Sequence, residues 1–318
     1  MCAQTINGLH HVTAICGDPK RNYAFYTGIL GLRLVKKTVN FDDPGTYHLY
    51  YADGAGTPGS VLTFFPWPDM PRGRDGTGLV SATAFAASEA ELPRWQDRLE
   101  EHGVKFRGPM QRFDEAYIEF EDPDGMRLEI VGADQAKAFQ PWIGSPVPAE
   151  MQLRGFHSVT LVEAGYELTQ ALLTKHMGWT PLRQSGERFR YQAADGGPAA
   201  LVDVICLPSA QRGRSGTGTV HHVAFRVDDD DAQLAWRQKL VGLGYNLSPV
   251  MDRNYFHSIY YREPGDILFE IATTPPGFAV DEPAETMGSA LMLPAQFEPI
   301  RNQIEAHLPP LKDRHANP

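Results

Sequence analysis

Two pairs of adjacent histidines and one glutamate are the residues of this chain best suited to bind a metal. One histidine pair lies in Gly8-Leu-His-His-Val-Thr13 and the other in Val220-His-His-Val-Ala-Phe225, whereas Glu270 lies in a later apolar segment. Imidazole and carboxylate groups are common ligands of divalent first-row metals. Whether these distant groups can meet depends on the elements that carry them.

Internal repeats indicate what those elements are. The segment Arg72-Gly-Arg-Asp-Gly-Thr-Gly78 recurs as Arg212-Gly-Arg-Ser-Gly-Thr-Gly218. The ten residues 121–130 match residues 262–271, and the first histidine segment matches Gly155-Phe-His-Ser-Val-Thr160. Repetition at this scale is typical of a chain built from copies of one supersecondary unit. We therefore expect four modules, covering about residues 8–70, 79–132, 155–208 and 219–274.

Each module has the same predicted pattern. A short strand precedes a helix of about three turns, and two or three strands follow. The helices are expected near residues 21–30, 90–102, 167–177 and 231–243, each followed by a glycine that can adopt the left-handed conformation of a helix C-cap. The fold class is therefore α+β, with four βαβββ modules.

The modules are expected to group into two halves. The N-terminal half covers residues 1–138 and the C-terminal half covers residues 152–274, with a proline-rich link at 139–151. A C-terminal extension, residues 275–318, is expected to add a loop and one helix near 297–307.

The motifs and their order resemble the vicinal oxygen chelate superfamily, which includes extradiol ring-cleaving dioxygenases, glyoxalase I and bleomycin-resistance proteins. Further segments are most similar to para-hydroquinone ring-cleaving dioxygenases: Tyr47-His-Leu-Tyr-Tyr-Ala-Asp53, Gly56-Thr-Pro-Gly59, Arg154-Gly-Phe-His-Ser158, Asp252-Arg-Asn254, Tyr260 and Phe269-Glu270. The resemblance implies modules paired into two half-open mixed β-barrels with helices outside. It also implies an Fe(II) cofactor, with a small aromatic diol and O2 as substrates.

The register of the repeats tests this resemblance. The position of His11 in the first strand is taken in the other modules by Ala82, Ser158 and His222. The last-strand position is assigned to Phe64 in module 1, to Glu129 in module 2, to no residue in module 3, and to Glu270 in module 4. Only modules 1 and 4 together supply two histidines and a carboxylate, His11, His222 and Glu270, the ligand set of non-haem iron(II) oxygenases. Manganese, zinc or nickel can also occupy such a site.

Two other residues are weaker ligand candidates. His157 aligns one residue before the His11 position, so strand alternation predicts that it faces the other way; it remains an alternative to His11. Glu129 has only Ala82 and Ser158 as partners, which predicts a disused ligand position or a surface acid.

The resemblance also implies roles around the metal. Tyr260, His221 and Arg253 are expected to be catalytic, and His10 and Thr13 to contact the substrate. Without the resemblance, Tyr260 reads as a core tyrosine and Arg253 as a surface charge. His10 and His221 read equally well as histidines bonded to a neighbouring strand.

Two other functions fit the same superfamily. A glyoxalase-like, metal-dependent lyase or isomerase usually has a second acid at the fourth position, where Phe64 is assigned here. A non-enzymatic small-molecule binder of the bleomycin-resistance type is usually a two-module chain without the metal triad. Both alternatives are therefore disfavoured relative to the dioxygenase.

Composition excludes several partner classes. Lys and Arg total 29 against 39 Asp and Glu, a formal net charge of −10, and no basic run argues for nucleic acid or an anionic membrane. No apolar run approaches the roughly 20 residues that span a bilayer, and residues 1–12 do not read as an export signal. The three scattered cysteines fit reduced thiols, so we expect a cytoplasmic protein. A homo-oligomer is compatible with the sequence, which specifies no patch for it.

Overall fold

Four copies of the βαβββ pattern make up most of the chain in the computed structural model, which describes residues 5–133, 139–193 and 196–311. Modules 1 to 4 are numbered here in chain order. Module 1 contains β1 (Leu9–Cys16), α1 (Pro19–Tyr23) continued by η1 (Ala24–Ile29), β2 (Arg33–Asn40), β3 (Asp43–Ala52) and β4 (Val61–Pro66). Module 2 contains β5 (Leu79–Ala87), η2 (Glu89–Glu91), α2 (Leu92–Glu101), β6 (Phe106–Arg112), β7 (Glu115–Glu121) and β8 (Arg127–Gly132).

The second half of the chain repeats this plan. Module 3 contains β9 (Phe156–Glu163), α3 (Glu167–Ala171) continued by η3 (Leu172–His176), β10 (Thr180–Ser185), β11 (Arg188–Gln192) and β12 (Leu201–Cys206). Module 4 contains β13 (Thr219–Val227), α4 (Asp230–Gly242), β14 (Met251–Asp252), β15 (His257–Arg262) and β16 (Leu268–Thr273). No helix among the described residues is both long and apolar enough to cross a bilayer.

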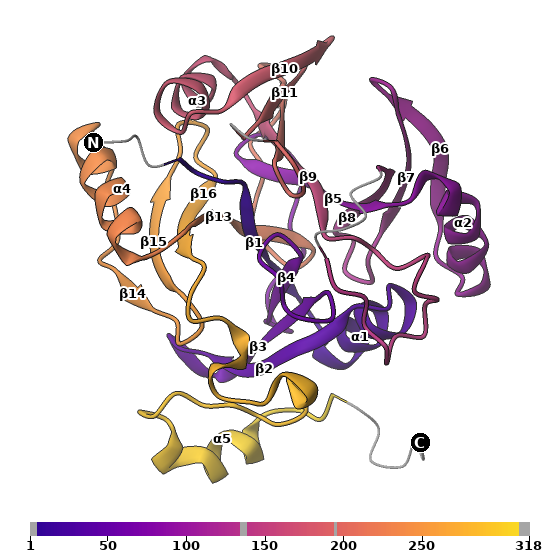
Figure 1. Cartoon of the computed structure of the whole chain (residues 1–318), viewed down its shortest axis with the longest axis vertical. Helices are drawn as coiled ribbons and strands as arrows, with labels where there is room; N and C mark the ends of the chain where they lie inside the picture. Colours follow the sequence, from indigo (N-terminus) through magenta and orange to yellow (C-terminus); the bar gives the residue numbers. More distant parts are fainter. Residues whose placement is uncertain (1–4, 134–138, 194–195, 312–318) are drawn as a thin grey trace.

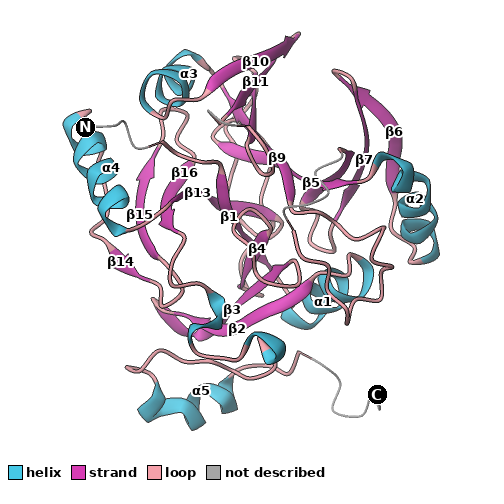
Figure 2. Cartoon of the chain, in the orientation of Figure 1, coloured by secondary structure: helices cyan, strands magenta, loops and turns pink. Residues whose placement is uncertain are grey.

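The strands form two curled sheets of eight strands each, with the helices on their outer faces (Figures 1 and 2). The first sheet has the order β14-β15-β16-β13-β1-β4-β3-β2 and so joins module 4 to module 1. The second sheet has the order β10-β11-β12-β9-β5-β8-β7-β6 and joins module 3 to module 2. The expected α+β fold of half-open mixed barrels is confirmed, as is the pairing of the first and fourth modules.

The central strands are buried on both faces, which explains their nearly continuous apolar sequence. Every residue of β1 is buried, and Val12 and Ala14 belong to the main hydrophobic core together with Phe25 and Tyr26 of the neighbouring helix. Because alternate residues of a strand point to opposite faces, His11 and Thr13 are left on the concave face of the sheet.

The four helices end where their glycines predict. Gly31, Gly103, Gly178 and Gly244 all have φ between 67° and 90°, a region that glycine enters without steric cost. One difference is that the first and third helices finish with wider turns, in which an amide bonds to the carbonyl five residues earlier. The amide of Leu30, for example, lies 3.1 Å from the carbonyl oxygen of Phe25.

The two repeated Arg-Gly-Arg loops, residues 72–78 and 212–218, fasten the two halves together. The Arg74 guanidinium donates to a carbonyl of the opposite loop at 3.0 Å, and Arg214 makes the reciprocal contact at 3.1 Å. A Cβ on Gly76 or Gly216 would overlap the backbone oxygen of the residue just before the other loop, so this close approach requires glycine. The repeated motif is therefore structural.

The C-terminal extension packs against β2 and β3, where Figure 1 shows it below the first sheet. It contains the short turns η4 (Phe278–Val280), η5 (Ala284–Thr286) and η6 (Glu298–Ile300), followed by α5 (Arg301–His307). The expected helix at 297–307 is present as η6 and α5. The turns η4 and η5 were not predicted, because their sequence has no apolar periodicity.

Candidate metal centre and its pocket

His11, His222 and Glu270 meet on the concave face of the first sheet. The two Nε2 atoms lie 3.3 Å apart, and Oε2 of Glu270 lies 3.3 Å from Nε2 of His11 and 2.9 Å from Nε2 of His222. All three side chains are at most 5 % exposed. The structure thus brings together the three residues that the repeat register singled out.

Two β-bulges orient the histidines. Leu9 pairs with Phe225 but His11 pairs with Ala224, so β1 carries one extra residue at His10. On β13 the extra residue is His221, because Thr13 pairs with His222 while Ala14 pairs with Val220. A bulge rotates the strand locally and re-aims its side chains. Both histidines of each pair can therefore contact one another, contrary to strict alternation.

Each candidate ligand is supported by the histidine before it. Nδ1 of His11 lies 2.9 Å from Nδ1 of His10, and Nδ1 of His222 lies 2.8 Å from Nδ1 of His221. The backbone of Thr273 is a further partner of His10. If His11 binds a metal through Nε2, its Nδ1 carries the proton and donates to Nδ1 of His10. Metal-binding histidines are commonly held by such a bond on the second ring nitrogen.

One carboxylate oxygen of Glu270 accepts a hydrogen bond, whereas the other accepts none from the described residues. Ser258 donates to Oε1, whereas Oε2 is buried without a hydrogen-bond partner among the described residues. Burial alone would raise the pKa of Glu270, but His11 and His222 outweigh burial and hold it well below its usual range. A buried carboxylate facing two imidazole lone pairs is costly unless a cation lies between them. The donor set therefore fits a divalent metal.

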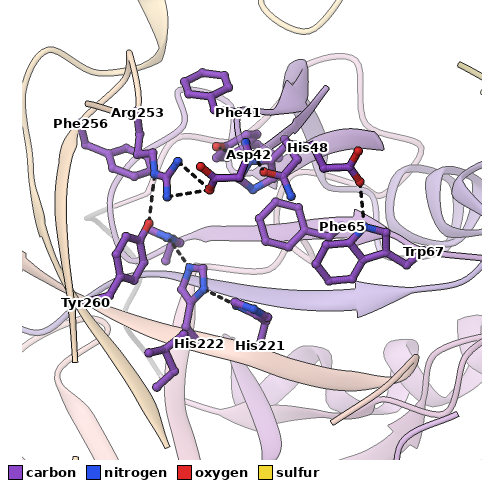
Figure 3. A pocket seen from close by; sticks show the side chains of 15 residues that line it. Phe41, Asp42, His48, Phe65, Trp67, His221, His222, Arg253, Phe256 and Tyr260 are labelled. Carbon is purple, nitrogen blue, oxygen red and sulfur yellow. Dashed lines mark hydrogen bonds and ion pairs between the residues drawn. The ribbon is translucent and has the colours of Figure 1, made fainter. Parts of the chain in front are cut away.

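A cavity of about 390 Å³ opens over these groups, a size in the range of small-molecule sites. Figure 3 shows Arg253 and Tyr260 on one side, Phe65 and Trp67 on the other, and His222 below them in this view. The walls are mainly aromatic, with Phe41, Phe65, Trp67, Phe256 and Tyr260 among the lining residues. Such walls suit a planar ring.

Arg253 is the only arginine or lysine among the described residues that line this cavity. Its Nε lies 3.3 Å from the hydroxyl of Tyr260, and both terminal nitrogens lie 3.3 Å from one oxygen of Asp42 (Figure 3). Burial, followed by the charge of Glu270, raises the pKa of Tyr260 above its usual value, so its phenol stays protonated. Arg253 and Tyr260 thus face the cavity, as expected.

The other predicted contacts divide into two groups. His221 lines the cavity beside Phe65 and Trp67. His10 and Thr13 are buried behind it and are not among its described lining residues, so the structure does not place them against a substrate.

His48 is a lining residue that the sequence analysis did not select. Its Nε2 lies 2.9 Å from the hydroxyl of Thr63, and the Tyr50 hydroxyl lies 2.8 Å from its Nδ1. Thr63 in turn contacts the hydroxyl of Thr13 at 2.8 Å. Burial, and then the charge of His11, lower the pKa of His48 well below its usual range, so its ring is neutral. The alternation of His48 and Tyr50 along β3 is the signal that could have identified them.

Strand pairing corrects the assignment of the last-strand positions. Glu270 pairs with Ala224, two residues after His222, and the residue paired in the same way with Thr13 is Thr63. Phe64 lies in the hydrophobic core instead. In module 3 the corresponding residue is Asp203, paired with Thr160, where no equivalent was assigned. The four positions are therefore Thr63, Glu129, Asp203 and Glu270.

The weaker ligand candidates lie in the second sheet. Glu129 is neither a surface acid nor free, because it forms a buried bidentate pair with Arg112. His157 sits at a bulge like that of His10, and its Nε2 lies 2.9 Å from Glu115. Since Glu115 also binds Arg190 on the concave face, the expectation that His157 points the other way is wrong. It does not approach the centre in the first sheet.

Comparisons with known proteins agree with this geometry. The sequence profile of the Glyoxalase/Bleomycin resistance protein/Dioxygenase superfamily matches residues 8–130 and 155–271. The "Putative ring-cleaving dioxygenase MhqO" of Bacillus subtilis (strain 168) is 46% identical over 315 residues, 99% of this chain and 100% of that protein. The "Chlorohydroquinone/hydroquinone 1,2-dioxygenase" of Sphingobium indicum is 36% identical over 307 residues, 95% of each chain.

Solved structures extend the comparison. A crystal structure of a "putative dioxygenase" from Bacillus subtilis matches with a TM-score of 0.93 and 46% identity, covering 98% of this chain and 99% of that one. Glyoxalase I from Zea mays matches with a TM-score of 0.62 at 15% identity, covering 84% of this chain and 92% of that one. At that identity the second match supports the fold alone.

Proposed function

Since the chain belongs to the glyoxalase/bleomycin resistance protein/dioxygenase superfamily, we propose that it is an iron(II)-dependent ring-cleaving dioxygenase. Its substrate would be a hydroquinone-type or catechol-type aromatic diol, cleaved in the extradiol manner with both atoms of O2 entering the product. The observation that carries this proposal is the convergence of His11, His222 and Glu270 beneath an aromatic-walled cavity.

His11, His222 and Glu270 would hold the metal through Nε2, Nε2 and Oε2. A divalent iron bound there supplies Lewis acidity and exchanges electrons with dioxygen. A metal held by only three protein groups would have further positions for a diol oxygen and dioxygen. Manganese, zinc or nickel could bind the same donors, so occupancy alone would not identify the working metal.

The pocket residues would bind the diol and stabilise its anion. A phenol has a pKa of ~10 in water, and the Arg253 guanidinium would favour the deprotonated form inside the pocket. The aromatic walls would hold the ring and exclude water. Tyr260, whose phenol remains protonated, could donate to an oxygen of the bound ring.

The positions of His221, His10 and Thr13 relative to the cavity suggest different roles for them. His221 lines the cavity and contacts His222. When His222 binds a metal through Nε2, its Nδ1 would donate to Nδ1 of His221, so the Nε2–H of His221 would donate a hydrogen bond to a substrate oxygen. His10 and Thr13 lie behind the cavity, so we propose that they support His11 and the Thr63–His48 contacts respectively.

The glyoxalase-like alternative needs a second acid at the fourth barrel position. Thr63 occupies that position, and its hydroxyl is engaged with Thr13 and His48. Glu270 is the only carboxylate in the described cluster of metal-ligating groups. The geometry therefore favours the dioxygenase.

Oxygen uptake tests the proposal. The protein would be loaded anaerobically with iron(II), mixed with a hydroquinone, and followed with an oxygen electrode. We expect uptake that is lost in His222→Ala and retained in His102→Ala, whose imidazole is exposed at the end of α2.

Two results would contradict the proposal. One is a loaded protein that consumes no oxygen with any hydroquinone or catechol. The other is turnover of a methylglyoxal–thiol adduct with zinc or nickel and without oxygen, which would favour the lyase.

A further inference from the structure

The C-terminal extension contacts the back of the pocket wall. Phe278 of η4 lies with its ring centroid 5.3 Å from those of Tyr50 and Tyr255 and 6.4 Å from that of Phe256. Tyr50 contacts His48, and Phe256 lines the cavity. The extension is therefore one side chain away from the candidate active site.

A buried lysine anchors this contact. Lys36 of β2 has no exposed surface, and its Nζ lies 2.5 Å from Oδ1 of Asp281 and 2.6 Å from Oε2 of Glu282. Oε2 of Glu282 also accepts from the amide of Gly288 at 3.2 Å. A lysine is rarely buried unless it is paired, so this cluster fixes the extension to the first sheet.

The second oxygen of Asp281 binds the turn between β14 and β15. Oδ2 accepts from the hydroxyl of Tyr255 at 2.9 Å and from the side-chain amide of Asn254 at 3.2 Å. Asn254 has φ of 67°, a conformation that costs energy for a residue with a Cβ and needs support from its surroundings. Asp281 supplies that support.

This turn carries two residues of the pocket. Arg253 precedes Asn254, and its amide donates to the carbonyl of Phe256 at 3.0 Å. The Phe256 ring centroid lies 4.9 Å from that of His11 and 5.0 Å from that of His10. A shift of the turn would therefore move Arg253, the only arginine or lysine among the described residues that line the cavity. It would also move the Phe256 ring, which packs against His11.

We propose that Asp281 is a positioning residue for the candidate active site. One carboxylate oxygen is held by Lys36, and the other sets the turn that aims Arg253 and Phe256 into the cavity. The C-terminal extension thereby completes a site whose metal-binding residues all lie in modules 1 and 4. The structural part of this inference is independent of the proposed function, whereas its kinetic consequence rests on it.

Hydrogen exchange tests the structural part in the full-length protein. Asp281→Asn keeps the shape but removes the charge, so exchange of the Arg253 and Gly277 amides should become about tenfold faster, as expected for loss of a charge-assisted hydrogen bond. The Arg253 amide donates to the carbonyl of Phe256, and the Gly277 amide of the extension donates to the carbonyl of Tyr255 in the turn. The control Glu298→Gln, which removes an exposed acid of the same extension, should leave their exchange unchanged.

A second variant guards against misfolding. Tyr255→Phe deletes only one hydroxyl and leaves the Lys36 pair intact, so it should act in the same direction with a smaller effect. Unchanged exchange in both variants would overturn the inference.

Kinetics test the consequence. Asp281→Asn should lower kcat/KM for a hydroquinone about tenfold, mainly through KM, because misaimed binding groups weaken substrate binding. Metal affinity, measured by titration with iron(II), should be unchanged, because the ligands do not lie on the turn. A fall in metal affinity with KM unchanged would overturn the positioning role. Absence of oxygen uptake in the unmodified protein would instead reject the proposed function and leave the exchange result to decide.

Discussion

The two sheets use the same backbone plan but complete their concave faces differently. In the first sheet, Oε2 of Glu270 faces two histidines beneath a cavity and has no hydrogen-bond partner among the described residues. In the second sheet the histidine positions are Ala82 and Ser158, and the two acids, Glu129 and Asp203, are bound by arginines. Even the bulges correspond, with extra residues at Ser81 and His157.

This difference shows how one scaffold satisfies buried acids in two ways. Arg112 binds Glu129, while Arg190 and Arg188 both bind Asp203 at 2.7–3.0 Å. A guanidinium supplies the positive charge and the hydrogen bonds that a carboxylate needs in a buried site. Among the described residues no arginine pairs with Glu270, and the proposed metal would supply the positive charge there.

The largest expected difference is between two equivalent glutamates. Glu129→Gln should lower the free energy of unfolding by about 3 kcal/mol, because it leaves the buried Arg112 without its ionic partner. Glu270→Gln should cost the metal-free protein less than Glu129→Gln does, because no buried arginine loses its ionic partner. Urea unfolding of both metal-free variants measures this.

For metal binding, the larger effect is expected in the Glu270 variant and not in the Glu129 variant. Glu270→Gln should weaken metal binding by about 100-fold or more and abolish stabilisation by added metal, whereas Glu129→Gln should bind as the parent does. Two results would contradict this comparison of the sheets. One is weaker metal binding by Glu129→Gln, and the other is a lower free energy of unfolding for metal-free Glu270→Gln than for metal-free Glu129→Gln.

A second expected difference concerns the last residues of the equivalent strands β1 and β9. At the end of β9, Glu163 is fully buried beside Glu263, whereas the equivalent end of β1 carries the neutral Cys16. Burial, and then the charge of Glu263, raise the pKa of Glu163 to about 8. The folded protein thus keeps a proton that the unfolded chain has released above its ordinary pKa, so stability should fall as the pH rises from about 4.5 to about 8.

Glu163→Gln should remove that loss and raise the free energy of unfolding at pH 8 by about 2 kcal/mol, with little change at pH 5. Denaturant unfolding across this pH range provides the measurement. Asp122, whose pKa burial raises to about 6, should retain a weaker dependence in the same direction. Parallel pH profiles for parent and variant would disprove the assignment.

The smallest expected effect is at the one neutral last-strand position. Thr63→Val removes the hydroxyl that joins Thr13 to His48, which should cost about 1 kcal/mol of stability. Metal affinity should be unchanged, because Thr63 is not a proposed ligand. A marked loss of metal in this variant would make Thr63 a fourth ligand and bring the first sheet closer to a glyoxalase-like site.

The overall architecture and the three converging residues could be predicted because they depend on repetition. The register of the first strands, read from the two histidine segments, fixed His11 and His222 as equivalent, and the glycines after the helices marked the module plan. These features are local and recur four times. The arginines of the second sheet were not predicted, since pairing across strands does not appear in local sequence.

The register of the last strands was harder for a physical reason. Every residue of β4 is buried, so its sequence has no polar alternation to show which face Thr63 and Phe64 occupy. Asp203 was readable as the one charge within the apolar β12, but its partners Arg188 and Arg190 come from another strand. The support from the C-terminal extension also depends on contacts between distant residues, such as Lys36 with Asp281.

The adjacency of β1 and β13 has a consequence for how the protein matures. Because the candidate ligands come from the first and last modules, a growing polypeptide on the ribosome cannot assemble the centre until residue 270 has emerged. Until then β1 lacks β13, its neighbour on one edge, and presents that edge to other strands in the cell. Any metal would therefore bind this centre late, and a chain truncated before β16 would lack Glu270.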